Sequence, residues 1–234
     1  MDYIIEGTKT AIRIIFSLDS ELIDVVLRSL LVSLTATVLA ALVAVPVFLF
    51  LGLKKFRGES LISRLLSTFM STPTVVVGLV VLLLLARRGP FGGLNLLYSI
   101  RAMVIAQFIL IFPLIAALTF EFSKQTGRSV KNLAYTLGAG RLRTTGLLIV
   151  ECKDAIFIHV ITAFSRAISE VGAVMMVGGN IKGMTNVMTT TISRYNSMGE
   201  YELAIALGII LLLVSCVINW VSWSFKEKGA KHGG

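Results

Sequence analysis

Two opposite charges inside an apolar segment are the residues most able to do chemistry. The segment 155–181 is uncharged except for Arg166 and Glu170. Either charge alone in lipid would cost on the order of 2.5–3.5 kcal/mol, so each needs a partner, a polar interior or water. Because they lie four positions apart, the spacing predicts that one helical face carries both. Two functions stay open: an ion pair that locks helices together, or the wall of a pathway for a polar solute.

Small and polar residues follow these charges. Gly178, Gly179 and Asn180 end the apolar run, a pattern that predicts a helix stop and a turn. The alternative is a flexible gate whose backbone amides meet an anion. Threonines beyond it either add hydroxyl donors for an oxyanion or belong to a turn. The candidate pathway or gate residues are Arg166, Ser169, Glu170, Gly172, Gly179, Asn180, Thr189 and Thr190.

No pattern in the sequence indicates catalysis. There is no GxxxxGK[ST] phosphate loop, and the Gly-Ala-Gly at 138–140 lacks the third glycine and the preceding strand of a dinucleotide site. His159 and His232 lie far apart, and Cys152 and Cys216 form no metal-ligand spacing. We therefore expect no catalytic residue, no metal site and no cofactor bound by this chain.

The elements that must position these residues are membrane helices. The chain has 234 residues, of which 56% are hydrophobic and 15% charged, whereas soluble domains average about 25% charged residues. A net charge of +9 in such a chain is typical of cytoplasmic loops and contact with anionic lipid, not of nucleic-acid binding. Five runs approach or exceed the ~20 residues that a span needs. They are 29–53, 65–86, 102–120, 155–181 and 203–225.

Flanking segments and prolines complete this outline. Residues 1–24 carry too many charges for a span, and their apolar residues recur at helical spacing, which predicts an amphipathic helix at the membrane interface. Pro46 predicts a kink in the first span, and Thr72-Pro73-Thr74 predicts a break or bend in the second. One membrane domain then covers 25–225, followed by a tail at 226–234.

Lysine and arginine set the expected orientation. Five spans put the two ends of the chain on opposite sides of the membrane. With the N-terminus outside, 13 Lys and Arg residues fall on the cytoplasmic side and 8 on the outer side, leaving Arg166 in a span. The excess predicts an outer N-terminus and a cytoplasmic C-terminus. The basic loop 121–154 is then cytoplasmic, and a short helix is expected in it over 131–137, stopped by Gly138 and Gly140.

This loop resembles the EAA loop of type I ABC importer permeases. The family pattern is E-A-A, three residues, G, nine residues and I-x-L-P. Gly138 falls on its glycine, and 132–134 stands in place of E-A-A with only the last alanine kept. Leu148, Val150 and Glu151 replace the I, L and P.

The segment after the loop resembles molybdate, sulfate and tungstate permeases, and most closely the tungstate branch. In that family an Arg and a Glu precede a Gly-Ala, and a Gly-Asn follows. Arg166, Glu170, Gly172-Ala173 and Gly179-Asn180 occupy these places. The resemblance extends over 25–225.

The resemblance implies an all-α type I importer fold in the inner membrane, with this chain as a homodimeric permease for an oxyanion. Tungstate is the expected substrate, with molybdate or sulfate as the alternatives. Its implied partners are cytoplasmic ATPase subunits that hold ATP and Mg, and an extracytoplasmic oxyanion-binding protein. The implied ATPase-coupling residues are Asn132, Leu133, Ala134, Thr136, Leu137, Gly138 and Ala139.

Two other classes of function remain as alternatives. A proton-coupled carrier would use Glu170 as its titrating group. A membrane enzyme or lipid-handling protein would need a catalytic cluster.

Overall fold

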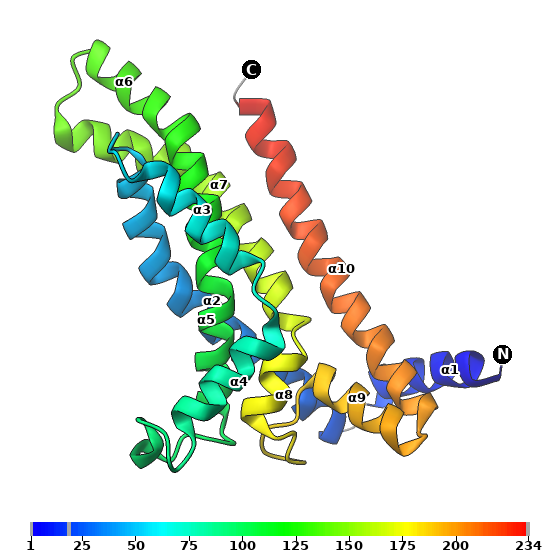
Figure 1. Cartoon of the computed structure of the whole chain (residues 1–234). Helices are drawn as coiled ribbons and strands as arrows, with labels where there is room; N and C mark the ends of the chain where they lie inside the picture. The colour runs from blue at the N-terminus through cyan, green and yellow to red at the C-terminus, as the bar shows by residue number, and fades with distance from the viewer. Residues whose placement is uncertain (1, 18–19, 233–234) are drawn as a thin grey trace.

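The computed structural model describes residues 2–17 and 20–232, and in this part of the chain every regular element is a helix. Three helices are long and apolar enough to cross a membrane, and two bent pairs add up to two more spans (Figure 1). The long helices are α2 (Ser20–Gly52), α5 (Ile100–Phe122) and α10 (Tyr201–His232). The bent pairs are α3 (Glu59–Met70) with α4 (Thr74–Leu85), and α7 (Arg141–Ile168) with α8 (Gly172–Gly178). The predicted all-α membrane fold is confirmed, and its five spans require each bent pair to be one span.

The first bend lies where proline predicts it. α3 and α4 meet at 89° across a short break, and Pro73 is the residue that precedes α4. Its fixed φ and missing N–H suit a helix start. α2, by contrast, continues as one helix through Pro46, and α5 continues through Pro113.

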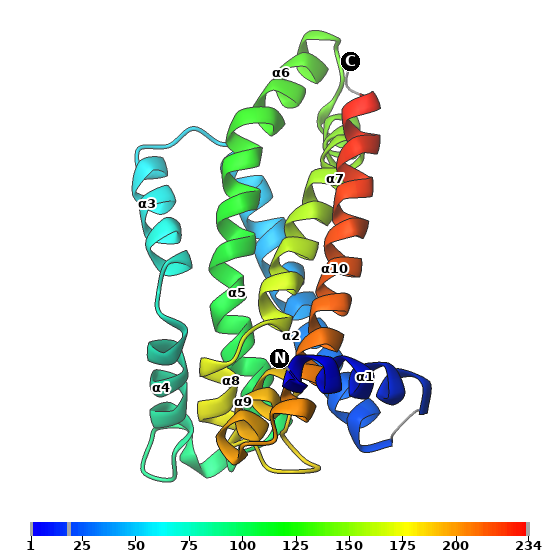
Figure 2. The same cartoon turned by 90° about the vertical axis from the view of Figure 1, so that its right-hand side faces the viewer.

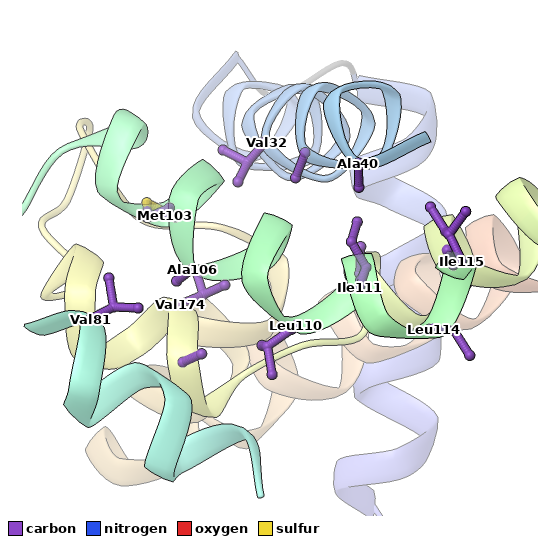
Figure 3. Close-up of a cluster of buried hydrophobic side chains, with 14 of the residues drawn as sticks. Val32, Ala40, Val81, Met103, Ala106, Leu110, Ile111, Leu114, Ile115 and Val174 are labelled. Atoms are coloured by element: carbon purple, nitrogen blue, oxygen red, sulfur yellow. The ribbon is translucent and has the colours of Figure 1, made fainter. Parts of the chain in front are cut away.

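α5 is the central helix of the bundle. It lies between α2 on one side and the α4–α8 pair on the other, as Figure 3 shows around Ile111 and Leu110. The α2 face toward it is built from small residues, with Ala36 and Ala40 fully buried. Small side chains let membrane helices approach closely, and α2 packs along α5 over much of its length.

Short helices cap the two ends of the bundle. α1 (Asp2–Ser17) packs across α10, where a Cβ added to Gly7 would lie 2.6 Å from Ile205 Cγ2 (Figure 2). α9 (Met188–Met198) precedes α10, and a short turn of helix, η1 (Gly92–Leu94), precedes α5. At the opposite end a π-helical segment, η2 (Ser123–Gly127), continues α5 into α6 (Arg128–Thr136).

The two ends differ in what they carry. α6 and the C-terminal end of α10 lie at one end, called here the α6 end, while α1, α8 and α9 lie at the other, the α9 end (Figures 1 and 2). This separation agrees with the predicted chain topology, and which end faces the cytoplasm stays a prediction. Residues 1, 18–19 and 233–234, in the predicted N-terminal segment and tail, lie outside the described residues.

Candidate functional site

The helix break between α7 and α8 forms the centre of the candidate site. The two helices meet at 59°, and Glu170 lies in the non-helical link between them. The prediction that Arg166 and Glu170 share one face of a continuous helix is therefore wrong. No ion pair within 4.0 Å joins these two residues in the described part of the chain.

A side chain from α5 helps to end α7. The Gln107 amide Nε2 donates a hydrogen bond of 2.9 Å to the carbonyl of Ala167, an oxygen that a continuous helix would pair with the N–H of Val171. The Glu170 N–H also bonds to this carbonyl at 3.2 Å, in the tighter i→i−3 pattern. Gln107 is thus a site residue that the sequence analysis missed. Its signal was the one amide side chain in the run 102–120, where Thr119 is the only other polar residue.

Glu170 fixes the elements that follow the break. Its Oε1 accepts a hydrogen bond of 3.2 Å from the N–H of Ala173 in the first turn of α8. Its backbone carbonyl accepts a hydrogen bond of 2.8 Å from the hydroxyl of Thr189 in α9. Glu170 therefore caps α8 and ties it to α9.

The two bent pairs touch each other through glycine. A Cβ added to Gly78 of α4 would lie 2.7 Å from Ala173 Cα. A Cβ added to Gly172 would lie 2.9 Å from Val75 Cγ2 and 3.6 Å from Glu170 Oε1. The lack of side chains at these two positions lets α4 lie directly against the start of α8.

The far end of α8 is the predicted stop. Gly179 ends the helix in the left-handed conformation with φ +70°, and Asn180 follows with φ +49°. The Asn180 amide donates a hydrogen bond of 3.0 Å to the carbonyl of Thr190, while its Oδ1 is buried with no partner among the described residues. Residues 179–190 run from the end of α8 into the first turn of α9, and we call them the gate segment because they include residues for which the sequence leaves a gate as an alternative.

The threonines of the gate segment are engaged with the backbone. Thr190 Oγ1 accepts a hydrogen bond of 3.1 Å from the N–H of Val187 and so caps α9. Thr189 bonds to Glu170, as described above, and both threonines are buried. These contacts favour the structural alternative for their hydroxyls over free donors for an anion.

The start of α2 anchors the gate segment. Ser29 Oγ accepts a hydrogen bond of 2.7 Å from the N–H of Met188, and Arg28 Nη1 donates to the side-chain and backbone oxygens of Asn186. Lys182 pairs with Glu21 at 2.6 Å, and this hydrogen bond raises the pKa of Lys182. The gate segment is thereby attached to the first turns of α2.

Arg166 lies apart from these bonds. It is exposed in the last turn of α7, where the helix C-terminus favours a positive charge. Ser169 is exposed beside it, and its hydroxyl donates to the carbonyl of Ser165 at 2.6 Å. Arg166 and Glu170 both line, with Gln107, a crevice too narrow to hold a water molecule, called here the Gln107 crevice. The structure therefore brings the two charges to one crevice without pairing them.

The predicted coupling residues form one exposed tip. α6 starts three residues earlier than the predicted helix, and Gly138 after it has φ +75°, which suits glycine. Ala134 is buried and accepts a hydrogen bond of 2.9 Å from the N–H of Ala139, which is half-buried. The other predicted coupling residues, Asn132, Leu133, Thr136, Leu137 and Gly138, are exposed.

Comparisons with known proteins agree with this arrangement. Residues 44–223 match the family described as binding-protein-dependent transport system inner membrane component. A tungstate uptake system permease protein TupB from Peptoclostridium acidaminophilum is 50% identical, covering 97% of this chain and 100% of its own length. A protein of the same description from Campylobacter jejuni is 34% identical, covering 97% and 95% of the two chains. A probable anion ABC transporter permease protein from Haloferax volcanii is 34% identical, covering 91% and 94%.

The family match covers most of the chain, including α6, both bent pairs and the gate segment. It confirms the resemblance drawn from the loop and from the segment that follows it. This chain belongs to the family of binding-protein-dependent transport system inner membrane components.

Proposed function

We propose that this chain is the permease subunit of an ATP-driven importer, that its substrate is a tetrahedral oxyanion, and that this oxyanion is tungstate. The substrate assignment is supported by the two tungstate uptake permeases that resemble it over nearly its whole length. Molybdate and sulfate are the alternatives, because both are tetrahedral dianions of the same class.

The exposed tip of α6 is the observation that carries the proposal of a driven permease. Leu133 and Leu137 are 61% and 78% exposed, and Tyr135 between them is also exposed. Fully burying a leucine side chain contributes about 1.5–3 kcal/mol, so this tip favours a partner with an apolar groove. The proposed function implies that this partner is a cytoplasmic ATPase subunit. This subunit would bind the ATP and Mg.

The α6 end faces the cytoplasm in this proposal. The excess of lysine and arginine near α6 and in the tail supports an outer N-terminus and a cytoplasmic C-terminus in the inner membrane. The α9 end would then receive the oxyanion from an extracytoplasmic binding protein.

Two copies of the chain would enclose the pathway. Arg166 is exposed near the bend of a span, and an arginine facing lipid costs on the order of 2.5–3.5 kcal/mol even on the milder scale. A second copy would cover it and leave a wet space whose walls carry positive charge toward an anion. The free oxygen of Gln107 and the capping carboxylate of Glu170 would mark the narrow part of this space.

A proton-coupled carrier receives less support. That function needs Glu170 to gain and lose a proton during transport, whereas its carboxylate is engaged in capping α8. Protonation on each cycle would remove the charge that strengthens this bond to the first turn of α8.

Reconstituted uptake tests the proposal. The chain, its ATPase subunits and a tungstate-loaded binding protein would be studied in proteoliposomes with ATP on the cytoplasmic side. We expect tungstate to accumulate with ATP and not with a non-hydrolysed analogue, and to outcompete molybdate and sulfate. Accumulation that follows a proton gradient without ATP would refute the proposal of an ATP-driven permease. A preference for another oxyanion would refute only the assignment of tungstate as the substrate.

A further inference from the structure

A cluster of charged side chains joins α3 to the base of α6. It consists of Glu59 and Ser63 on α3, Glu121 at the end of α5, Lys124 in η2 and Arg128 at the start of α6, and we call it the Arg128 cluster. Arg128 Nη2 lies 2.7 Å from Glu59 Oε2. Lys124 Nζ lies 3.0 Å from Glu121 Oε2 and 3.9 Å from Glu59 Oε1, and it donates to Ser63 Oγ at 3.0 Å.

Arg128 makes more contacts than an exposed ion pair needs. Its Nε donates to the carbonyl of Gly52 and its Nη2 to that of Lys54, each at 2.8 Å. The side chains of Arg128, Lys124 and Glu59 are only 16%, 19% and 21% exposed. The planar guanidinium thus joins the end of α2, the loop after it and α3 to the first residue of α6.

α3 is attached to the bundle by two features. Leu66 is buried and Ile62 and Met70 are half-buried against the core that includes α5, while Leu61, Leu65 and Phe69 are exposed. The Arg128 cluster is the polar attachment, and it holds the first turns of α3 to the base of α6.

The segment that bears this attachment is itself irregular. Lys124 lies in η2, which is π-helical. π-helical turns are rare in proteins overall, and many of those that occur lie at functional sites. η2 is the junction between α5 and α6. A tilt of α6 would carry Arg128 and Lys124 with it.

From α3 a continuous chain of contacts reaches the candidate site. α3 leads through the break before Pro73 into α4, which packs on α8 through Gly78 and Ala173. Gly172, at the start of α8, lies two residues beyond Glu170. These contacts give a movement of α3 a route to the Glu170 link.

We propose that the Arg128 cluster is the contact through which a displacement of α6 is transmitted to α3, and then through α4 to the break at Glu170. This inference rests on the proposed function, because it requires an ATPase that moves α6. Arg128 and Glu59 are positioning residues in it, since neither touches the oxyanion.

The test uses the complete transporter, the permease with its ATPase subunits, in lipid nanodiscs and in proteoliposomes. Glu59→Gln keeps the side-chain shape and removes the charge that faces Arg128 and Lys124. Arg128→Lys keeps the charge and removes the fork that reaches the carbonyl of Gly52. Glu200→Gln, at an exposed position of the α9 end, is the matched control. The measurements are ATP hydrolysis, oxyanion uptake, and hydrogen exchange of α3 and α6 before and after ATP is added.

We expect both cluster variants to assemble and to hydrolyse ATP at a rate within about twofold of wild type. The ratio of oxyanion transported to ATP hydrolysed should fall at least about tenfold, which corresponds to about 1.4 kcal/mol or more. ATP should still change hydrogen exchange in α6 and no longer change it in α3. An unchanged transport ratio overturns the inference, and so does loss of assembly in both variants, which would give the cluster a purely structural role. A wild-type transporter that fails to use ATP would instead refute the proposed function.

Discussion

Leu137→Ala should weaken binding of the ATPase subunit and leave the stability of the permease unchanged. Leu137 is 78% exposed and follows α6 directly, so its removal leaves no cavity in the free chain. Leu→Ala removes about three carbon groups at ~0.8 kcal/mol per buried group, and scaling by the exposed fraction gives about 2 kcal/mol if the partner covers the site fully. That energy corresponds to a roughly 30-fold rise in the dissociation constant.

The assay is binding of detached ATPase subunits to the permease in nanodiscs, with thermal unfolding of the permease measured in parallel. Leu94→Ala provides the control, because Leu94 is a leucine of similar exposure (61%) at the α9 end. We expect its dissociation constant to match that of wild type. Unchanged ATPase binding in Leu137→Ala would refute the docking argument, and so would a fall in permease stability large enough to explain the weaker binding.

The remaining predictions concern the break and the crevice. Gly78→Ala should lower the free energy of unfolding by about 1–3 kcal/mol in denaturant titrations, because its Cβ meets the α8 backbone. The control Gly146→Ala, at a position with open space around it, should be neutral or stabilising. Equal effects of the two substitutions would contradict the close packing of α4 on α8. Gln107→Leu should reduce uptake with assembly intact, because the Ala167 carbonyl loses its donor; wild-type uptake would exclude this role. Arg166→Gln should reduce uptake at least about tenfold while ATPase binding is unchanged, and full uptake would remove Arg166 from the pathway. Glu170→Gln keeps an oxygen that can cap α8, so it should retain uptake, whereas a proton-coupled carrier would lose it.

Local signals in the sequence were sufficient for much of the fold. Apolar runs located the spans, because lipid demands about 20 residues of continuous apolar helix. Pro73 located the first bend, since its ring removes a helical hydrogen bond and fixes φ. Gly138 located the end of α6, where its φ of +75° suits a residue without a side chain.

The second bend could not be predicted, because its causes lie far away in the chain. No proline marks the break near Glu170. Gln107, 60 positions from Ala167, captures a carbonyl there, and glycines on α4 and α8 permit the close contact that accompanies the turn. Such pairings depend on which helices become neighbours, which a single sequence does not reveal. For the same reason the sequence did not predict the ion pair between Arg128 and Glu59, which are separated by 69 positions.

In the proposed mechanism, force from a separate ATPase enters this chain at α6 and opens a pathway between two copies. An electron cryomicroscopy structure of the permease with its ATPase subunits would show both features at once. We expect two copies of the chain, with α6 of each seated in an ATPase groove and both Arg166 side chains facing a shared aqueous space. A structure with α6 free of the ATPase, or with Arg166 facing lipid, would refute the mechanism.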